Sequence, residues 1–118
     1  MAGIEVKNLG TPDEVRTPAK TKIDVVHVGT TEVGRFTFEP GWKWSECIKP
    51  VVKTDSCQAE HLGIVISGRL RVVHDDGTQA DVAAGDAYFI APGHDAWVLG
   101  DETFEGIEFK SAATYAKG

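Results

Sequence analysis

Short runs of alternating apolar and polar residues, separated by turns that contain glycine, fill the sequence from Ile23 onward. Because successive side chains of a strand point to opposite faces, a period of two predicts strands that bury one face. Two such runs cover residues 23–28 and 34–39, and an Asp-Gly pair, Asp76-Gly77, separates two others as in a tight hairpin. The remaining expected strands are 42–49, 57–68, 69–74, 79–83, 87–90, 94–99 and 104–109. Many short strands without a long helical pattern predict an all-β fold, either an antiparallel barrel or a sandwich.

The first 22 residues do not follow this pattern and are expected to form an N-terminal arm. Thr11 is a typical helix N-cap and Pro12 a typical first helical residue, which predicts a short helical turn in the arm. Residues 111–118 are small and polar and are expected to fray. We therefore expect three parts: an arm at 1–22, a β-barrel at 23–110 and a C-terminal tail at 111–118.

Size and charge exclude several classes of function. A chain of 118 residues is long enough for one domain with a single hydrophobic core. The net charge is −6 and the basic residues are scattered, which argues against a nucleic-acid partner, because phosphate binding requires clustered Lys and Arg. No apolar run is long enough to span a bilayer, and the first eight residues lack the apolar segment of a secretory leader. We therefore expect a soluble, cytoplasmic protein without a nucleic-acid or membrane partner.

The stretch 57–68 combines a predicted strand with metal-ligand side chains at one end. Alternation along the strand places Cys57 and His61 on the same face, so that the two side chains can converge on one point. In a reducing compartment Cys47 and Cys57 are expected to be thiols or ligands, with a short-loop disulfide as the alternative. Another alternative is that Cys57 and His61 only fill the barrel interior, since cysteine is among the most buried residue types.

The spacing of several turn residues follows a known pattern. They are Gly41, Gly68, Gly85, Pro92 and Gly93. The intervals from Gly41 to Cys47 and from His61 to Gly68 fit the two ends of the motif G-x5-H-x-H-x3,4-E-x6-G, and the segment 85–93 resembles the motif G-x5-P-x-G-x2-H. These are the two motifs of the cupin superfamily, which the sequence resembles from about residue 34 to residue 109. The resemblance implies a double-stranded β-helix, or jelly-roll, barrel with a short N-terminal arm.

The ligand positions of the two motifs carry other residues in this chain. The first family histidine falls on Cys47 and the family glutamate falls on His61. The segment between them is longer than in the family pattern, and the extra residues supply Cys57. In the second motif the histidine position is Ala96, and His94 lies two residues earlier, on the same strand face.

The cupin framework and these residue types together imply a divalent metal site. The expected ligands are Cys47, Cys57, His61 and His94. Thiolate and imidazole suit zinc best, and iron, nickel and manganese are the alternatives. A non-haem iron oxygenase is disfavoured, because no carboxylate occupies the family position.

The function expected from the sequence is that of a small single-domain cupin that binds a divalent metal and a small polar molecule in its barrel. With one open coordination position the metal would support Lewis-acid chemistry, so that the question of enzymatic activity stays open. Two alternatives remain: a non-catalytic ligand-binding or sensor barrel, and a structural module without metal. A homodimer is expected, because small barrels have exposed strand edges that need cover.

Overall fold

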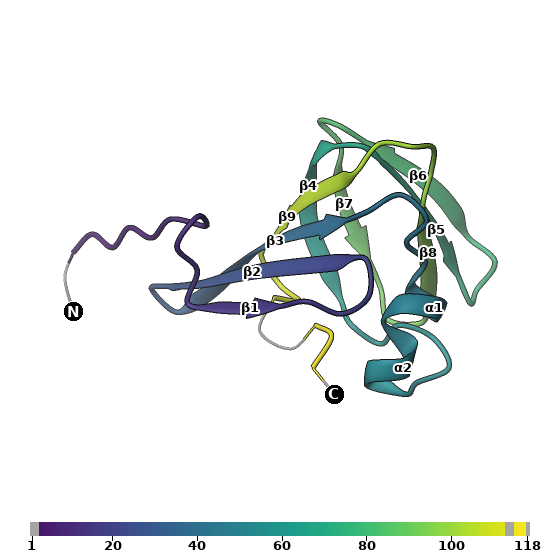
Figure 1. Cartoon of the computed structure of the whole chain (residues 1–118), viewed down its shortest axis with the longest axis horizontal. Coiled ribbons are helices and arrows are strands. Elements are labelled where there is room, and N and C mark those ends of the chain that lie inside the picture. The colour runs from purple at the N-terminus through teal and green to yellow at the C-terminus, as the bar shows by residue number, and fades with distance from the viewer. Residues whose placement is uncertain (1–2, 113–114, 118) are drawn as a thin grey trace.

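Two antiparallel β-sheets enclose the hydrophobic core of the chain (Figure 1). The computed structural model describes residues 3–112 and 115–117. Within these residues one sheet has the strand order β1-β2-β3-β9-β4-β7 and the other the order β6-β5-β8. The strands are β1 Glu14–Arg16, β2 Thr21–Val28, β3 Thr31–Phe38, β4 His61–Ser67, β5 Arg69–His74, β6 Gln79–Ala83, β7 Ala87–Ile90, β8 His94–Val98 and β9 Phe104–Glu108. The all-β fold class predicted from the sequence is confirmed.

The core forms where the inward faces of the two sheets meet. Along β4 and β9 buried residues alternate with more exposed ones, as a strand with one buried face requires. Phe36 on β3, Val65 on β4 and Phe104 on β9 project into this interior and are fully buried. The interior is therefore hydrophobic, and the few polar side chains inside it need hydrogen-bond partners there.

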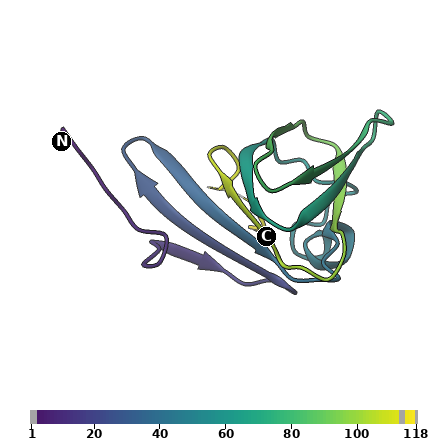
Figure 2. The same ribbon diagram turned by 90° about the horizontal axis from the view of Figure 1, so that it is seen from above.

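The hairpin of β2 and β3 extends beyond the barrel together with β1 (Figure 2). The two strands pair along their whole length, from Thr21 opposite Phe38 to Val28 opposite Thr31. Gly29 follows β2 with a φ of +58°, a left-handed conformation that glycine adopts without a steric penalty. The projecting hairpin makes the molecule elongated, with extents of 45 × 29 × 25 Å.

Gly63 allows β4 to approach β9 and the polar residues inside the barrel. A Cβ atom at this position would collide with the carbonyl oxygen of Ile107 and would lie 2.9 Å from both Tyr88 Oη and Glu108 Cγ. We expect Gly63→Ala to lower the free energy of unfolding by about 1–3 kcal/mol, as overpacking of a core does. Urea denaturation measures the change, and Gly3→Ala, whose Cβ would meet no atom within 4 Å, is the control. Equal stability of the two variants would contradict the close packing at Gly63.

The helical turn expected in the N-terminal arm is wrong, because this segment pairs with β2. β1 (Glu14–Arg16) adds to the edge of the six-stranded sheet, with Glu14 opposite Val25. An unpaired strand edge presents a row of backbone hydrogen-bonding groups. Pairing with that edge outweighs the local preference of Thr11 and Pro12 for a helix start.

The strand expected over residues 42–49 is also wrong. Two short helices, α1 (Trp44–Cys47) and α2 (Lys49–Val52), occupy this region. The Asp95 carboxylate on β8 accepts a hydrogen bond from the backbone N–H of Ser45 at 3.1 Å, which satisfies one of the free N–H groups at the start of α1. A capping group from a distant strand therefore favours a helix where the sequence pattern alone indicates a strand.

The C-terminal tail packs onto the barrel. Ala112 and Tyr115 are buried, and their carbonyl oxygens accept hydrogen bonds from Arg16 Nη1 at 2.9 and 2.6 Å. The Tyr115 ring centroid lies 4.9 Å from that of Phe36 and 5.3 Å from that of His61. The expectation of a fraying tail is thus wrong for residues 111–112 and 115–116, while residues 113, 114 and 118 lie outside the described residues.

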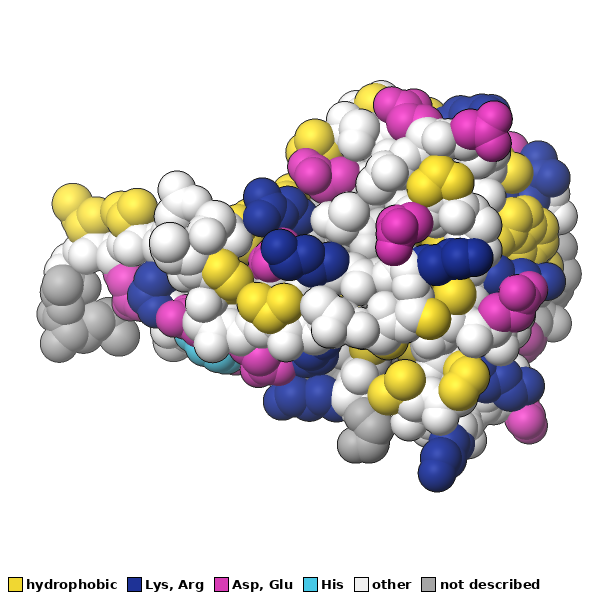
Figure 3. Space-filling view, viewed as in Figure 1, with side chains coloured by type: hydrophobic (Ala, Val, Ile, Leu, Met, Phe, Trp, Pro, Cys, Tyr) yellow, Lys and Arg dark blue, Asp and Glu magenta, His cyan; other side chains and the backbone are white. Residues whose placement is uncertain are grey.

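On the face seen in Figure 3, Lys and Arg side chains are interspersed with Asp and Glu. No helix in residues 3–112 or 115–117 is both long enough and apolar enough to cross a membrane.

Candidate metal centre

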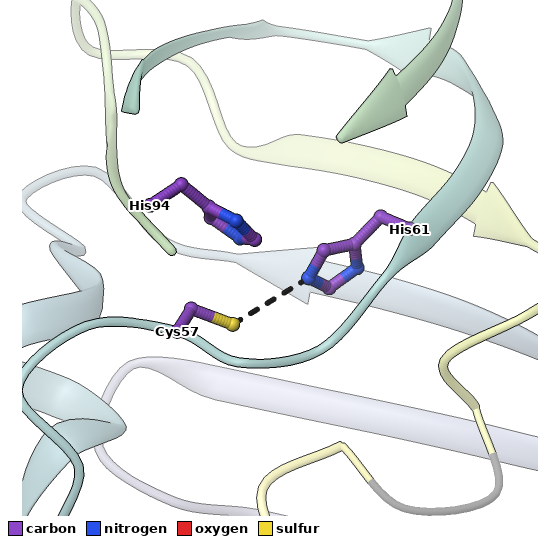
Figure 4. Close-up of side chains that lie close together, drawn as sticks. All are labelled: Cys57, His61 and His94. Carbon is purple, nitrogen blue, oxygen red and sulfur yellow. Dashed lines mark hydrogen bonds between the residues drawn. The ribbon is translucent and has the colours of Figure 1, made fainter. Parts of the chain in front are cut away.

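Three of the four expected ligands meet inside the barrel (Figure 4). One ligand atom from each of Cys57, His61 and His94 lies within 4.8 Å of the other two. All three residues are buried. The predicted meeting of Cys57 and His61 is therefore observed, although the strand expected over residues 57–68 begins only at His61, and His94 completes the cluster from the other sheet.

Backbone pairing holds the cluster together. Cys57 lies just before β4 and forms an isolated bridge with His94, in which the Cys57 N–H donates to the His94 carbonyl at 2.7 Å. The Gly93 N–H in turn donates to the Cys57 carbonyl at 2.7 Å. His61 is the first residue of β4, and His94 is the first residue of β8. The cluster thus sits at the point where the two sheets are joined.

The two imidazole rings are oriented by acceptors on their far sides. His61 Nδ1 lies 2.6 Å from Glu108 Oε1, and His94 Nδ1 lies 2.8 Å from the carbonyl oxygen of Ala91. Because carboxylate and carbonyl oxygens accept hydrogen bonds, both Nδ1 atoms carry the proton. Both Nε2 atoms are then the ones available as ligands. Metal-binding histidines in proteins are oriented by such hydrogen bonds.

Glu108 is a buried carboxylate that the sequence analysis did not identify. It accepts hydrogen bonds from His61 Nδ1, from Tyr88 Oη at 2.7 Å and from Ser111 Oγ. Burial by itself would raise the pKa of Glu108, but the charge and hydrogen bond of His61, together with the hydrogen bonds of Ser111 and Tyr88, lower it below its usual value. One sequence signal was available, because Glu108 shares the buried face of β9 with Phe104.

Cys57 Sγ and His61 Nε2 lie 3.6 Å apart, and their pKa values are shifted in the directions that favour a thiolate–imidazolium pair in the metal-free protein. Burial acts to raise the pKa of Cys57, but hydrogen bonds and charges from His61 and His94 lower it to about 6. Burial likewise acts to lower the pKa of His61, but the charge of Glu108 and the hydrogen bonds of Cys57 and Glu108 raise it to about 10. A metal ion would take the place of the proton between these two groups.

This pair predicts an unusual dependence of stability on pH. The raised pKa of His61 stabilises the fold below its ordinary value of 6.5, and this contribution is lost as the pH rises to about 10. The lowered pKa of Cys57 stabilises the fold above its ordinary value of 9.0, and this contribution is lost as the pH falls to about 6. Between pH 6.5 and 9.0 the folded and unfolded pairs each hold one proton, so that the two effects cancel.

The cancellation can be tested with metal-free Cys57→Ser. In this variant only His61 remains, and it is protonated in the folded but not in the unfolded state. Glu108 still raises the pKa of His61 in this variant, although the contribution of Cys57 is gone, so we expect a loss of up to about 1.4 kcal/mol of stability per pH unit, relative to the unchanged protein, just above pH 6.5. Urea denaturation at several pH values measures the two slopes, and parallel slopes would contradict the thiolate–imidazolium pair.

Cys47 does not belong to the cluster. It is the last residue of α1 and is buried, but the metal-ligand group consists of Cys57, His61 and His94 alone among the described residues. The helix, formed where a strand was expected, gives its side chain a different direction from that expected for a strand. The alternative of a disulfide is also wrong, since Cys47 and Cys57 are both free thiols.

The separation of Cys57 and His61 fits a zinc ion, and His94 offers a third ligand atom within 4.8 Å of theirs. Ligands on a tetrahedral zinc with Zn–S of about 2.3 Å and Zn–N of about 2.0 Å lie about 3.5 Å apart, close to the observed 3.6 Å between Cys57 Sγ and His61 Nε2. A catalytic zinc site usually has three protein ligands and a fourth position for water or substrate, whereas a structural zinc site has four protein ligands.

Solved structures of other proteins share this fold. A cupin 2 conserved barrel domain protein from Salinispora arenicola is 18% identical, with 95% of this chain and 92% of that chain covered and a TM-score of 0.61. A Klebsiella pneumoniae protein with a double-stranded β-helix domain is 18% identical, with 96% and 88% covered and a TM-score of 0.59. Oxalate decarboxylase from Lactobacillus farciminis is 16% identical, with 86% of this chain but 32% of the decarboxylase covered and a TM-score of 0.61.

No protein-family model matches the sequence, and the comparison with curated proteins gives no match. The structural likeness agrees with the sheet order and with the turn spacing of the sequence. The chain therefore has the cupin fold, the double-stranded β-helix that its sequence motifs predicted.

Proposed function

We propose that this protein binds one divalent metal ion, zinc, through Cys57, His61 and His94, and presents it to a small molecule inside the barrel. The observation that carries the proposal is the orientation of the two histidines. Acceptors hold both Nδ1 atoms, so both Nε2 atoms are available beside a thiol whose pKa is lowered to about 6. A thiolate with two such imidazoles suits zinc, with iron, nickel and manganese as the alternatives.

A bound metal would supply Lewis acidity at its open position. The protein residues would have separate tasks. Glu108 would keep the proton on His61 Nδ1 and fix the ring, and the Ala91 carbonyl would do the same for His94. The surrounding hydrophobic core would exclude bulk water and strengthen the electrostatic interactions within the site.

Metal analysis tests the proposal directly. Protein purified without an affinity tag should contain close to one metal ion per chain, measured by mass spectrometry of the elements zinc, iron, nickel and manganese. The metal should be lost on acidification, because thiolate and imidazole ligands become protonated. A ratio far below one after incubation with each metal would contradict the proposal.

A second candidate function is that of a reactive thiol without metal. Cys57 Sγ, His61 and Glu108 lie in the order nucleophile, base and orienting carboxylate, with separations of 3.6 and 2.6 Å. In Cys47→Ser protein, iodoacetamide should then modify Cys57 with a pH midpoint of about 6. Complete protection by one equivalent of zinc would favour the metal site, whereas labelling in the presence of zinc would favour the reactive thiol.

We also propose that the protein forms a homodimer through the outer face of the six-stranded sheet. Large apolar side chains are exposed there: Leu62, Ile64 and Ile66 on β4, Phe89 on β7, and Phe109 just after β9. Apolar patches of this kind are common at interfaces. Sedimentation equilibrium should show a dimer, and Ile64→Lys should convert it to a monomer. A monomer in the protein without this substitution would contradict the proposal.

We also propose a cytoplasmic location, with which the free thiols of both cysteines agree.

A further inference from the structure

A second cavity adjoins the candidate metal centre on the side of the two helices. A volume of about 190 Å3 there is open to the centres of water-sized molecules, compared with about 20 Å3 in the barrel interior beside His61 and His94. The interior space suits about one water molecule, whereas the second cavity has room for a small organic molecule.

The wall of this cavity is apolar on one side and meets the metal centre on another. Cys57 is a member of the metal-ligand cluster and also lines the cavity. The side chains of Ile48, Val52 and Ala59 line it as well. A molecule in the cavity would therefore have apolar contacts and would lie next to the candidate metal position.

Tyr115, from the C-terminal tail, lies at the boundary between the two spaces and lines both of them. Its backbone N–H donates to the Ser111 carbonyl at 2.9 Å, and its own carbonyl accepts a hydrogen bond from Arg16 at 2.6 Å. Its ring packs against Phe36 and His61, with centroid separations of 4.9 and 5.3 Å. These contacts fix the tyrosine beside a candidate metal ligand.

The hydroxyl of Tyr115 has no hydrogen-bond partner within the part of the chain that the structure describes. The Tyr88 hydroxyl, in contrast, donates to Glu108 at 2.7 Å. Among the same described residues, Trp44 Nε1 is the only unpartnered side-chain polar atom that is completely enclosed. The Tyr115 hydroxyl is therefore unpartnered without being enclosed, so that a molecule in the cavity has access to it.

The other polar side chains of the cavity are already engaged as donors. The Gln58 amide donates to the carbonyl oxygen and to Oγ of Ser56, at 3.3 and 3.0 Å, and the Thr54 hydroxyl donates to the Ser56 carbonyl at 2.8 Å. Among the described residues, Tyr115 is therefore the side-chain donor that is left for a ligand in this cavity. A phenol at neutral pH carries its proton, so it offers one O–H group to an acceptor.

The charge of the site favours a neutral ligand. Neither cavity has Lys or Arg among its described lining residues. The charges of the Cys57 thiolate and the Glu108 carboxylate together balance a divalent ion. An anionic ligand would leave an uncompensated buried charge, which is strongly unfavourable.

We propose that the second cavity binds a small uncharged molecule with one oxygen acceptor on an apolar body, and that the Tyr115 hydroxyl recognises this oxygen by donating a hydrogen bond to it. The apolar body lies against Ile48, Val52 and Ala59. The proposal names the ligand class of the site, and it rests on the proposed function only for the role of the metal. It assigns a binding residue to the tail, which the sequence analysis left without a function.

The hydroxyl-bearing Cζ atoms of the tyrosines test this proposal, in protein labelled with 13C at that position. The chain has two tyrosines, so Tyr115→Phe assigns both signals by removing one of them. On titration with cyclohexanol we expect the Tyr115 signal to shift, while the Tyr88 signal stays in place because its hydroxyl is bonded to Glu108. An unchanged Tyr115 signal would mean that the cavity holds water only, which would overturn the proposal.

Tyr115→Phe removes the hydroxyl and keeps the ring contacts with Phe36 and His61. Cyclohexanol binding, followed by calorimetry, should weaken about two- to tenfold, the effect of one neutral hydrogen bond. The urea midpoint of unfolding should stay the same, because the hydroxyl bonds no described residue. Unchanged cyclohexanol affinity in this variant would remove Tyr115 from the proposed site.

Two matched variants test the place of the ligand. Val52→Phe fills the cavity and should abolish the shift of the Tyr115 signal, whereas Val51→Phe, at a position outside the cavity lining, should leave it intact. Cyclohexanecarboxylate should bind at least about tenfold more weakly than cyclohexanol, because its charge has no partner. Tighter binding of the carboxylate, or the same response in both valine variants, would contradict the proposal.

Metal content measured on the same samples separates this proposal from the proposed function. Zinc at one equivalent without a cyclohexanol effect would overturn the ligand class and leave the metal site standing. A cyclohexanol effect in protein that takes up no metal would support the cavity as a binding site and overturn the proposed metal function.

Discussion

Cys57→Ser should weaken zinc binding by at least about 100-fold. Loss of a hydrogen bond behind a ligand already lowers metal affinity about 10- to 100-fold, and removal of one of three ligands is a larger change. Serine keeps the shape of the side chain but offers no thiolate at neutral pH, so that two imidazoles remain. Competition with a chromophoric chelator at pH 7.5 measures the affinity of the unchanged and variant proteins.

Cys47→Ser is the matched control for this experiment. Cys47 and Cys57 are both buried free cysteines, but only Cys57 belongs to the metal-ligand group. Zinc affinity within about twofold of the unchanged protein is expected for Cys47→Ser. Equal losses in the two variants would mean that the measured effect comes from the fold and not from the ligand, and that result would count against the site.

Glu108→Ala should lower the free energy of unfolding of the metal-free protein by about 3–5 kcal/mol. The carboxylate is buried and accepts hydrogen bonds from His61, Tyr88 and Ser111. Removing one member of a buried ion pair leaves the charge of His61 without its partner, which is more costly than the loss of a single contact. Guanidinium denaturation at pH 7 measures this change.

Two further variants define the role of Glu108. Glu105→Ala lies on the same strand but on the less buried face, and it should change stability by less than about 0.5 kcal/mol. Glu108→Gln keeps an acceptor oxygen for His61 while removing the charge, and we expect it to reduce zinc affinity about 10- to 100-fold. A stable Glu108→Ala protein with unchanged zinc affinity would show that Glu108 neither supports the fold nor orients His61.

The strands of the barrel, and the proximity of Cys57 to His61, could be predicted from local sequence patterns. The period-two runs and the Asp76-Gly77 turn predict strands that the structure contains as β5 and β6. The same alternation predicted that Cys57 and His61 meet, and they do, although β4 begins at His61 and Cys57 lies outside the strand, paired with His94. Glycines at fixed spacing predict the turns that connect the strands of the barrel, because a turn conformation depends on only a few adjacent residues.

Other features depend on groups that are distant in sequence. Asp95 accepts a hydrogen bond at the start of α1 from β8, which favours a helix at residues 44–47 although their apolar pattern has a period of two. β1 forms because the edge of β2 offers it a partner, and the tail is held by Arg16 near the opposite end of the chain.

The sequence by itself determined the all-β class and the cupin framework, because each depends on side-chain alternation or turn conformation over a few residues, and it indicated Cys47, Cys57, His61 and His94 as candidate metal ligands. Only the tertiary structure decided that Cys57, His61 and His94 lie together, that Cys47 does not join them, and that Glu108 orients His61. These outcomes depend on which side chains the closed barrel brings within hydrogen-bonding distance. Burial then favours such pairings, since a polar group inside the core without a partner costs free energy.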